Sequence, residues 1–549
     1  MNRDTDIIIV GAGPVGLTLA HLLGMRGIDV ILVEARDELI DYPRGVGIDV
    51  EALRTMQSIR MIDQVLPHTV PDQPVRIING KGRVIARMAP TTREFGYPRR
   101  NGFTQPDVDR ELLAGLARYS NVKVWFGHEG VDVTQDADKV VITVQDAAGK
   151  RTELSGLYAV GTDGGRSYIR GALGVDFPGE TLPSHGLVID VANDPLGTPH
   201  AVFGGDPKRG YASIALPHGL RRWEFMLKDG ETDEMADTDA FVNDLLAEHV
   251  PDPTALQVIR RRVYTLNARV ASDFRNRRIL IAGDASHLMP VNAGQGWNSG
   301  MRDAINLGWK LAAVIKGTCD DTLLDTYTTE RRDHVRAMVD LSVNMGKLTT
   351  SRSVWKTTLR DAASAVMDVV PPLKQWVSGM GFKPLPKYEK GVVVHNPIPK
   401  SKSVVTRGRE PMAGRLFPQP KVTTANAKDI LFDDVVGSEW RIVAWNNDPA
   451  KLIAHKTREQ VDHLGARLME VVPQIQLSWA IDNVSPGVTA VGDHTGVFQT
   501  WFDNSPFSVF IVRPDHVIAA ECLAQDLDNV LRQVFQKVRL TPVPQYAMA

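Results

Sequence analysis

Residues 7–34 read IIIVGAGPVGLTLAHLLGMRGIDVILVE, and the order of apolar runs and glycines here sets the expected fold of the N-terminal half. Four apolar residues, 7–10, predict a buried parallel strand. Three glycines in GxGxxG spacing follow at once, and the next residues have the apolar spacing of a helix. A second apolar strand, 29–33, ends at Glu34. This strand–turn–helix–strand order is typical of a dinucleotide-binding βαβ unit.

Each glycine of this motif has its own expected role. Gly11 allows the tight turn out of the strand, Gly13 lets a pyrophosphate approach the backbone, and Gly16 lets helix and strand pack closely. The helix N-terminus offers free N–H groups and a positive dipole end to phosphates. Glu34, followed by Ala35, stands where a carboxylate can bond the ribose of an adenosine. A glycine-rich turn in an unrelated α/β unit is the alternative, and this stretch does not distinguish FAD from NAD.

The composition limits the classes of function. A chain of 549 residues is too long for one core and suggests roughly two to four domains. Because 63 Lys and Arg residues nearly balance 65 Asp and Glu residues, we expect no nucleic-acid partner and no membrane surface. Only two cysteines are present, without a CxxC pair or metal-ligand spacing, which favours a reducing cytoplasm and no metal site. The polar N-terminus and the absence of a long apolar run predict neither a signal peptide nor a membrane span.

A glycine-rich loop, PRGVGID at 43–49, follows the first unit and carries Arg44 and Asp49. A loop so close behind the βαβ unit can lie against the ligand, and a solvated surface turn is the alternative. Further along, Pro106 predicts a helix that begins after Gln105. Gln105 then stands at a loop-to-helix junction, where its side chain can face the same ligand.

A second glycine motif, TDGGRS at 162–167, follows a short apolar strand. Asp163 either caps the helix that follows or belongs to a second contact with the same dinucleotide. Arg170 lies one or two turns into that helix, where it can pair with Asp163.

The region 185–228 is rich in strand-like runs and predicts a sheet inserted between the dinucleotide-binding pieces. Such a sheet is a natural roof for a substrate pocket. Trp223 and Glu224 fall on opposite faces of its last run, because side chains alternate along a strand. Arg221 and Arg222 either hold a substrate carboxylate or are solvated charges at the strand end.

The third motif, RILIAGDASHLMPVNAGQGWNSG, spans residues 278–300. Gly283 ends a buried strand and lets the backbone pass close to a ligand, while Asp284 can accept hydrogen bonds from a polyol chain. FAD has such a chain in its ribitol and NAD has none, so this motif favours FAD. The glycine-rich loop around Gly296 leads into a helix whose positive N-terminal end would stabilise a flavin ring that becomes anionic on reduction.

Together, GAGPVG with Glu34, TDGGRS with Arg170, and RRILIAGDASHLMP resemble the three FAD motifs of the single-component FAD aromatic hydroxylases, the para-hydroxybenzoate and phenol hydroxylase family. The resemblance implies an α/β fold with a Rossmann-like FAD-binding domain over residues 1–390 and a substrate-binding sheet inserted at about 181–275. Residues 391–549 are expected to form a linker and a thioredoxin-like C-terminal domain, and the residue patterns there predict a helix near 458–471 and a strand over 475–481. Because the cysteine pair of thioredoxins is absent, that domain is expected to be structural or to support a dimer.

The resemblance also assigns parts of the cofactor to this sequence. The first motif and Glu34 would bind the ADP half of FAD, and Asp163 would support the pyrophosphate region. Arg44 and Gln105 would contact the phosphate and ribityl region, and Asp284 the ribityl hydroxyls. The expected cofactor-binding residues are Gly11, Gly13, Gly16, Glu34, Ala35, Arg44, Gln105, Asp163, Gly283, Asp284 and Gly296.

The reaction implied by the resemblance is hydroxylation of a phenol ring. NADH or NADPH docks transiently and reduces FAD, and the reduced flavin takes up O₂ to form a hydroperoxide that passes one oxygen atom to the ring. The expected substrate is a 3-hydroxyphenyl alkanoate such as 3-(3-hydroxyphenyl)propionate, or a related phenol, and the product is of catechol type. Monomer and homodimer both stay open.

Asp49 and Tyr264 are the candidate catalytic residues. A phenol has a pKa near 10, so a hydrogen-bond acceptor near its oxygen would activate the ring. Both positions resemble ones that touch substrate in phenol hydroxylases. Asp49 can instead cap the helix that follows it, and Tyr264 can be an aromatic core residue.

Three alternatives share these motifs. The first is a hydroxylase of larger polyketide aromatics. The second is a flavin reductase that never activates O₂, and the third is a flavoprotein retained as a binding or scaffold module.

Overall fold

The structure is a computed structural model that describes residues 3–351, 353–384, 387–397 and 410–543. It divides into two compact units. The first consists of Met1–Thr92, Pro98–Ala304 and Val335–Pro384, and the second of Arg93–Tyr97, Ile305–His334 and Leu385–Ala549. Helices α8 (Gly296–Ile315) and α9 (Asp325–Thr349) each have residues in both units.

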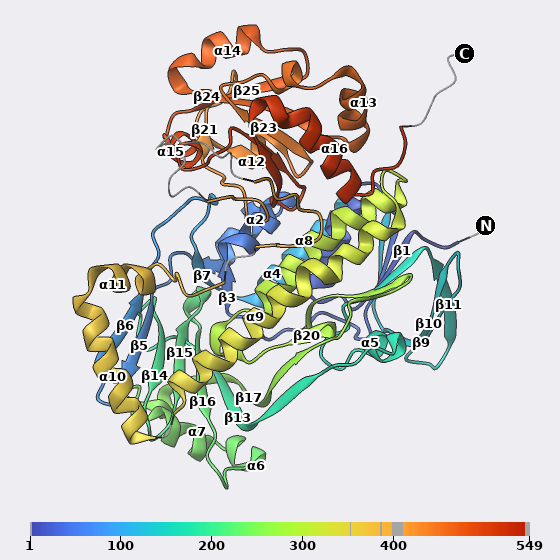
Figure 1. The fold of residues 1–549 in the computed structure, drawn as a ribbon. Helices are drawn as coiled ribbons and strands as arrows, with labels where there is room; N and C mark the ends of the chain where they lie inside the picture. The colour runs from blue at the N-terminus through green and yellow to red at the C-terminus, as the bar shows by residue number, and fades with distance from the viewer. Residues whose placement is uncertain (1–2, 352, 385–386, 398–409, 544–549) are drawn as a thin grey trace. The chain divides into compact units, whose positions relative to one another are not determined.

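A six-stranded sheet carries the three glycine motifs of the first unit (Figure 1). Its strand order is β18-β19-β12-β1-β2-β8, parallel except for β18. The strands are β1 (Ile7–Val10), β2 (Val30–Val33), β8 (Val122–Trp125), β12 (Tyr158–Gly161), β18 (Arg275–Asn276) and β19 (Ile279–Ile281). Helix α1 (Pro14–Gly24) connects β1 to β2, so the predicted βαβ unit and the α/β fold class are confirmed.

Parallel pairing brings the ends of three strands together. Val10 pairs with Gly161, and Gly161 pairs with Ile281. The three motifs, far apart in the sequence, therefore follow carboxyl ends that meet at one edge of the sheet. Ligands of open α/β sheets bind at this kind of edge.

An eight-stranded sheet, of order β20-β17-β13-β16-β15-β14-β5-β6, corresponds to the predicted insert. Its strands are β5 (Val75–Asn79), β6 (Val84–Met88), β13 (Gly179–Ala192), β14 (Ala201–Gly205), β15 (Tyr211–Ala215), β16 (Arg221–Met226), β17 (Gln257–Val270) and β20 (His287–Leu288). Hairpin β5–β6 comes from outside the predicted insert, because β5 pairs with β14 in parallel. Trp223 is buried in an apolar cluster whereas Glu224 lines a pocket, so their predicted opposite faces are confirmed.

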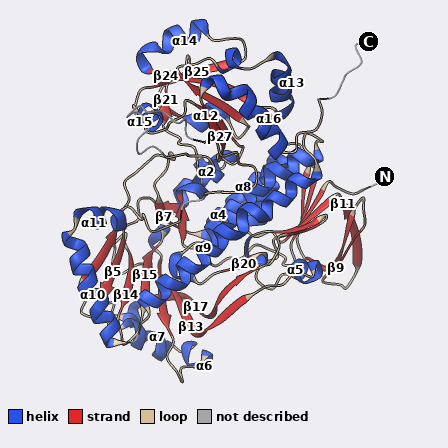
Figure 2. Cartoon of the chain, in the orientation of Figure 1, coloured by secondary structure: helices blue, strands red, loops and turns tan. Residues whose placement is uncertain are grey.

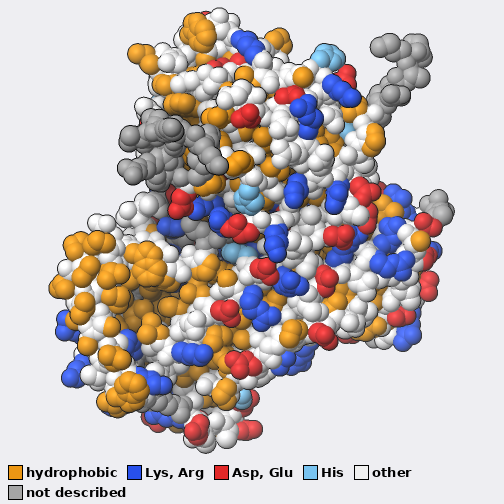
Figure 3. Space-filling model, in the orientation of Figure 1, with side chains coloured by type: hydrophobic (Ala, Val, Ile, Leu, Met, Phe, Trp, Pro, Cys, Tyr) orange, Lys and Arg blue, Asp and Glu red, His pale blue; other side chains and the backbone are white. Residues whose placement is uncertain are grey.

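Two small sheets and several helices complete the first unit (Figure 2). The sheets are β3 (Gly47–Asp49), β7 (Arg100–Phe103) and β4 (Thr69–Val70), and β9 (His128–Gln135), β10 (Val140–Asp146) and β11 (Arg151–Gly156). The further helices are α2 (Val50–Ser58), α3 (Ile62–Val65), α4 (Gln105–Gly115), α5 (Tyr168–Leu173), α6 (Asp233–Ala236), α7 (Asp239–Leu246), α10 (Val354–Val369) and α11 (Pro371–Ser378). Helices α10 and α11 pack on β6 and carry exposed apolar side chains, among them Trp355 and Val369. Figure 3 shows apolar side chains gathered on the left of the view, where Figure 1 places these two helices.

The second unit contains a mixed five-stranded sheet of order β25-β24-β23-β26-β27. Strands β23 (Arg441–Trp445), β24 (Arg467–Pro473) and β25 (Val488–Asp493) are parallel, and β26 (Val509–Val512) and β27 (Ile518–Cys522) form an antiparallel hairpin. The unit also has the hairpin β21 (Lys421–Val422) and β22 (Ile430–Leu431), and helices α12 (Phe432–Val436), α13 (His455–Leu464), α14 (Leu477–Asn483), α15 (Val497–Asp503) and α16 (Leu527–Lys537). A separate C-terminal α/β sheet was expected, and it is present.

A buried ionic cluster connects residues 305–334 to the rest of the second unit. Glu330 accepts hydrogen bonds from Lys310 Nζ (2.7 Å) and Arg513 Nη1 (2.7 Å), and all three side chains are fully buried. Arg513 also pairs with Asp515. Of the predicted linker, residues 398–409 lie outside the described residues, while Val392 is buried in the core of this unit. No helix in the described parts of the chain is long and apolar enough to cross a membrane.

Candidate active site

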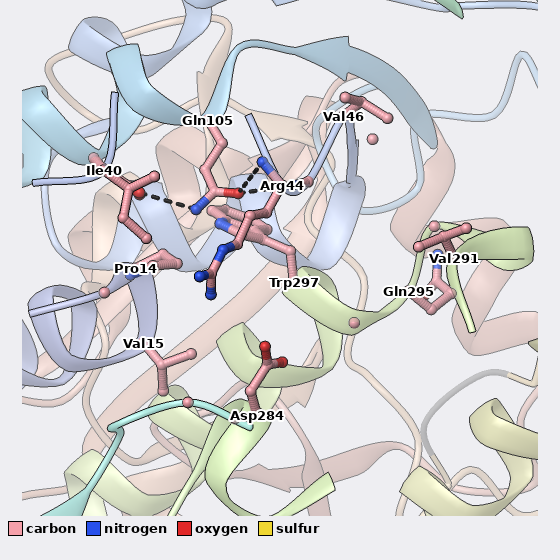
Figure 4. Close-up of a pocket in the computed structure, with 18 of the residues that line it drawn as sticks. Pro14, Val15, Ile40, Arg44, Val46, Gln105, Asp284, Val291, Gln295 and Trp297 are labelled. Atoms are coloured by element: carbon pink, nitrogen blue, oxygen red, sulfur yellow. Dashed lines mark hydrogen bonds between the residues drawn. The ribbon is translucent and has the colours of Figure 1, made fainter. Parts of the chain in front are cut away.

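One pocket of the first unit lies at the sheet edge where the three motifs meet (Figure 4). The glycine turn contributes Gly13, the third motif contributes Asp284, and the start of α8 contributes Gly296. Three side chains of the eight-stranded sheet, Phe203, Ile214 and Glu224, line the same pocket. The pocket therefore joins the predicted nucleotide site to the predicted substrate sheet.

The glycines of the first motif have the geometry that their roles require. Gly11 has φ +107°, and a Cβ there would lie 2.6 Å from the carbonyl oxygen of Thr162. A Cβ on Gly16 would lie 2.1 Å from the Gly11 carbonyl oxygen, which is sterically forbidden. Gly13 is the opposite case, because a Cβ there would meet nothing within 4 Å. Gly11 and Gly16 shape the turn, and Gly13 leaves the backbone open to the pocket.

Glu34 and Asp284 place carboxylates in the pocket. Glu34 Oε2 accepts a hydrogen bond from Ala12 N (2.8 Å), which ties the end of β2 to the glycine turn. Asp284 is open to the cavity but surrounded by protein, and this desolvation raises the pKa of its carboxyl. Gly283 has φ +62° and packs against Val15, where a Cβ would lie 2.8 Å away. Ala35 is exposed and does not line the pocket.

Gln105 fixes the loop that carries Arg44. Its Oε1 accepts hydrogen bonds from Arg44 N (3.2 Å) and Gly45 N (2.7 Å), as Figure 4 shows for Arg44. Its Nε2 donates to Asp109 Oδ2 (3.0 Å). Asp109, one turn along α4, also lines the pocket, and burial raises its pKa to about 7. The loop thus lies against the pocket, in preference to the solvated turn.

Asp163 stands behind the pocket rather than in its lining. Its carboxylate accepts hydrogen bonds from Ser167 Oγ (2.5 Å) and Ile169 N (3.1 Å), so it orders the start of α5. Arg170 donates to the carbonyl oxygens of Ala285 (3.0 Å) and Gly165 (3.0 Å) rather than to Asp163. Arg170 therefore connects the second motif to the third.

Asp49 is buried outside the pocket lining and caps α2. Its Oδ1 accepts a hydrogen bond from Ala52 N (3.0 Å), as the capping alternative predicts. Its Oδ2 pairs with Arg302 and with Lys383 Nζ (2.6 Å), and these two cations hold the pKa of Asp49 well below its usual range. Arg302 also pairs with Glu51.

Tyr264 lies behind Glu224 on the eight-stranded sheet. Its hydroxyl donates to Glu224 Oε2 at 3.5 Å, a weak contact. Burial raises the pKa of Tyr264 well above its usual value and also raises the pKa of Glu224. Of the two, only Glu224 lines the pocket.

Arg221 and Arg222 are neutralised within the sheet. Arg221 donates to both oxygens of Asp194 (2.6 and 2.8 Å) and Arg222 to both oxygens of Asp190 (2.7 and 2.9 Å). Each guanidinium therefore already pairs with a carboxylate of the protein. Neither predicted role, binding of a substrate carboxylate or a solvated charge at the strand end, describes these two arginines.

Comparisons with known proteins identify the family. Residues 4–342 match the family described as FAD binding domain, and residues 414–537 match the HcaD C-terminal domain. A 3-(3-hydroxy-phenyl)propionate/3-hydroxycinnamic acid hydroxylase of Mycobacterium sp. (strain JLS) is 48% identical over 98% of this chain and 93% of its own. A protein of the same name from Escherichia coli O8 is 44% identical over 98% of this chain and 96% of its own. The chain belongs to the FAD-dependent aromatic hydroxylases.

Solved structures of other flavin monooxygenases have the same fold. The flavin-dependent monooxygenase PieE, in complex with FAD and substrate, matches with a TM-score of 0.78 at 20% identity over 98% of this chain and 100% of its own. Aklavinone-11 hydroxylase, with FAD and aklavinone, matches with a TM-score of 0.75 at 20% identity and the same coverage. At such identities the likeness concerns the fold alone.

The pocket of this flavin hydroxylase fits FAD by its chemistry. The open backbone at Gly13 suits a pyrophosphate, and Glu34 suits the ribose hydroxyls. Asp284 has carboxylate oxygens that would suit the ribityl hydroxyls. The N-terminus of α8, from Gly296, lines the same pocket, where its N–H groups would suit the flavin ring.

Sequence reasoning did not single out several ionisable residues of this pocket as site residues, among them Arg100, Asp109 and Glu224. Asp109 had one available signal, since it lies four residues after Gln105 on a helix and so shares its face. Glu224 was assigned to the face opposite Trp223, but nothing in the sequence indicated that this face meets the cofactor site. Arg100 had no signal at all, because its place depends on pairing between β7 and β3, which are distant in the chain.

Proposed function

We propose that this FAD hydroxylase acts on a phenol that carries a carboxylate side chain, such as 3-(3-hydroxyphenyl)propionate or 3-hydroxycinnamate. In the balanced reaction, the phenol, O₂, NAD(P)H and a proton give the dihydroxy product, NAD(P)⁺ and water. The observation that carries the proposal is 44–48% identity, over nearly the full chain, to hydroxylases named for these two acids. Larger polyketide substrates have weaker support, because aklavinone-11 hydroxylase is only 20% identical.

FAD, when bound, supplies hydride acceptance from NAD(P)H and activation of O₂. The chain itself has to orient the phenol, exclude water and draw away the phenol proton. We infer that Phe203 and Ile214 contact the ring, and that Glu224 accepts a hydrogen bond from the phenol hydroxyl. A carboxylate with a raised pKa is a better match to a phenol, since proton transfer is most effective when the pKa values are close.

Tyr264 then acts as a positioning residue through its contact with Glu224. A direct catalytic role for Tyr264 or for Asp49 stays a prediction. Four further statements stay predictions: the choice between NADH and NADPH, a cytoplasmic location, a homodimer, and a domain boundary near residue 390.

The test is NAD(P)H oxidation with parallel O₂ uptake over a panel of phenols, with the products identified by mass. We expect the 3-hydroxyphenyl acids to stimulate both signals and to gain one oxygen atom. NAD(P)H oxidation without O₂ uptake would indicate a reductase. Flavin binding without stimulation by any phenol would indicate a binding module, and preferred turnover of polycyclic phenols would favour the polyketide alternative.

A further inference from the structure

Arg100, on β7, is a cation in this pocket that pairs with no carboxylate among the described residues. It lines the same pocket as Asp284 and Glu224. Its Nε is buried, and no atom of the described residues accepts a hydrogen bond from it. Within the described parts of the chain, no carboxylate forms an ion pair with its guanidinium either.

The guanidinium lies at the end of the pocket away from the glycine turn. Strand β7 pairs with β3, and Arg100 Nη1 lies 3.7 Å from the position that a Cβ on Gly47 would occupy. Gly47 follows Val46, and Figure 4 shows Val46 on the opposite side of the pocket from Pro14 and Val15 of the glycine turn. Arg100 is therefore separated from the part of the pocket that suits the pyrophosphate.

Nearby carboxylates do not neutralise Arg100. Asp49 is its register partner across the two strands, but Asp49 is held by Arg302 and Lys383. No carboxylate contributes to the lowered pKa of Arg100, which has burial as its cause.

Arg100 is half-buried, but its Nε is shut off from water without a hydrogen-bond partner, which is costly unless a ligand brings an anion. Burial lowers the pKa of Arg100 only to about 10, so the guanidinium is still charged at neutral pH. The planar guanidinium can donate two parallel hydrogen bonds to a carboxylate, a geometry that an ammonium group does not offer. The chemistry of this position is thus that of a carboxylate-binding group.

We propose that Arg100 binds the carboxylate of the aromatic acid substrate and so selects phenols with an acidic side chain over neutral phenols. This inference rests on the proposed hydroxylase function. The aromatic ring would then contact Phe203 and Ile214, with its hydroxyl toward Glu224, whose negative charge disfavours the reverse orientation. Arg100 is a binding and specificity residue in this arrangement, not a catalytic one.

The test compares an acid with its neutral analogue on the FAD-loaded enzyme. The ligands are 3-(3-hydroxyphenyl)propionate and 3-(3-hydroxyphenyl)propan-1-ol, and dissociation constants are read from the change in flavin absorbance. For Arg100→Gln we expect the Kd of the acid to rise about 10- to 100-fold, the effect of losing a charged hydrogen bond, while the Kd of the alcohol stays unchanged. Arg100→Lys should weaken the acid less, because it keeps the charge.

Arg99→Gln is the matched control, because its neighbouring guanidinium donates to the Gly379 carbonyl (3.1 Å) and does not line the pocket. We expect wild-type affinities for both ligands in this variant. The proposal fails if Arg100→Gln weakens acid and alcohol equally, leaves the acid unaffected, or loses flavin instead. It also fails if the wild-type enzyme binds the alcohol as tightly as the acid, a result that needs no variant.

The two proposals can fail separately. If the wild-type enzyme hydroxylates the acid but Arg100→Gln keeps its preference over the alcohol, the assignment of Arg100 alone is wrong. If no phenol of either kind stimulates NAD(P)H oxidation by the wild-type enzyme, the hydroxylase proposal falls and the Arg100 assignment falls with it.

Discussion

At the scale of single residues, burial shifts the pKa values of carboxyl groups in the pocket, and the local sequence does not indicate these shifts. Glu224 has its pKa raised by desolvation and stands at the substrate sheet. In our proposal it acts in the ionised form, so the wild-type rate of hydroxylation should decline as the pH drops through this raised pKa.

Glu224→Gln keeps the size of the side chain and removes its ability to take a proton. We expect bound FAD and an intact fold, a rate of product formation lower by about 100-fold, and loss of the acidic limb of the pH profile. Product formation between pH 5 and pH 8 measures both effects, with the exposed Glu248→Gln as control. A variant that hydroxylates at the wild-type rate with the wild-type pH profile would remove Glu224 from the mechanism.

Asp109 should make the stability of the protein depend on pH. Its pKa is raised from 3.8 to about 7 in the folded state, so between these values the folded chain holds a proton that the unfolded chain has lost. Its contribution to stability is therefore present below about pH 4 and is lost as the pH rises toward 7.

Asp109→Asn removes this loss and keeps an oxygen that can accept from Gln105. The variant should be more stable than wild type at pH 8 by a few kcal/mol at most, since one pKa unit is worth about 1.4 kcal/mol. Near pH 4 the two should be alike. Urea unfolding at both pH values with a fixed FAD concentration measures this, and the exposed Asp138→Asn should follow wild type. An equal difference at both pH values would contradict the linkage.

At the scale of elements, the turn between β1 and α1 separates fold from cofactor binding. Gly16→Ala should destabilise the protein by about 1–3 kcal/mol or more, because its Cβ would meet the Gly11 carbonyl oxygen at 2.1 Å. Gly13→Ala should leave the melting temperature of the flavin-free protein unchanged, because its Cβ meets nothing within 4 Å. The same methyl group faces the pocket and should weaken FAD binding by about tenfold or more.

Thermal melting and FAD titration of the pair check this separation. The assigned role of Gly13 is wrong if flavin-free Gly13→Ala has a lower melting temperature than flavin-free wild type. It is also wrong if the variant binds FAD as tightly as wild type.

Asp49 connects three elements, since it caps α2, ends β3 and pairs with Arg302 of α8. Asn is an equally good N-cap, so Asp49→Asn isolates the ion pairs. We expect a loss of about 1–3 kcal/mol in the free energy of unfolding, because Lys383 loses its near carboxylate while Arg302 keeps its pair with Glu51.

The catalytic role predicted for Asp49 is tested by the same variant well below its melting temperature. Bound flavin with reduced hydroxylation would support that role. Full turnover, with one product formed per NAD(P)H, would leave Asp49 with a structural role only.

For the whole molecule, sequence patterns predict what depends on local order. The βαβ unit and the motifs ending at Asp163 and Asp284 are confirmed as neighbours, because buried parallel strands force their carboxyl ends together. Two predictions in the C-terminal unit are wrong. The helix expected over 458–471 ends at Leu464, because Gly465 adopts φ +73° and the apolar run after it is β24.

The second error is the strand expected over 475–481, which is helical from Leu477. There Ile475 is 92% exposed, while Leu477 and Ala480 are buried, which is the three-residue spacing of a helix. In so short a run of alternating apolar and polar residues, the sequence does not distinguish a helix from a strand. Arg100 and Glu224 could not be assigned to the site for a different reason. Their side chains reach the pocket through pairing of strands that are distant in sequence, which no local pattern records.

The most direct test of the central claim uses labelled oxygen. The purified, FAD-loaded protein is incubated with NADH or NADPH, ¹⁸O₂ and 3-(3-hydroxyphenyl)propionate, and the mass of the product is measured by mass spectrometry. The account predicts a dihydroxy acid that carries one ¹⁸O atom, with one NAD(P)H oxidised for each product molecule. Hydrogen peroxide as the sole product, or an acid recovered without ¹⁸O, would contradict it.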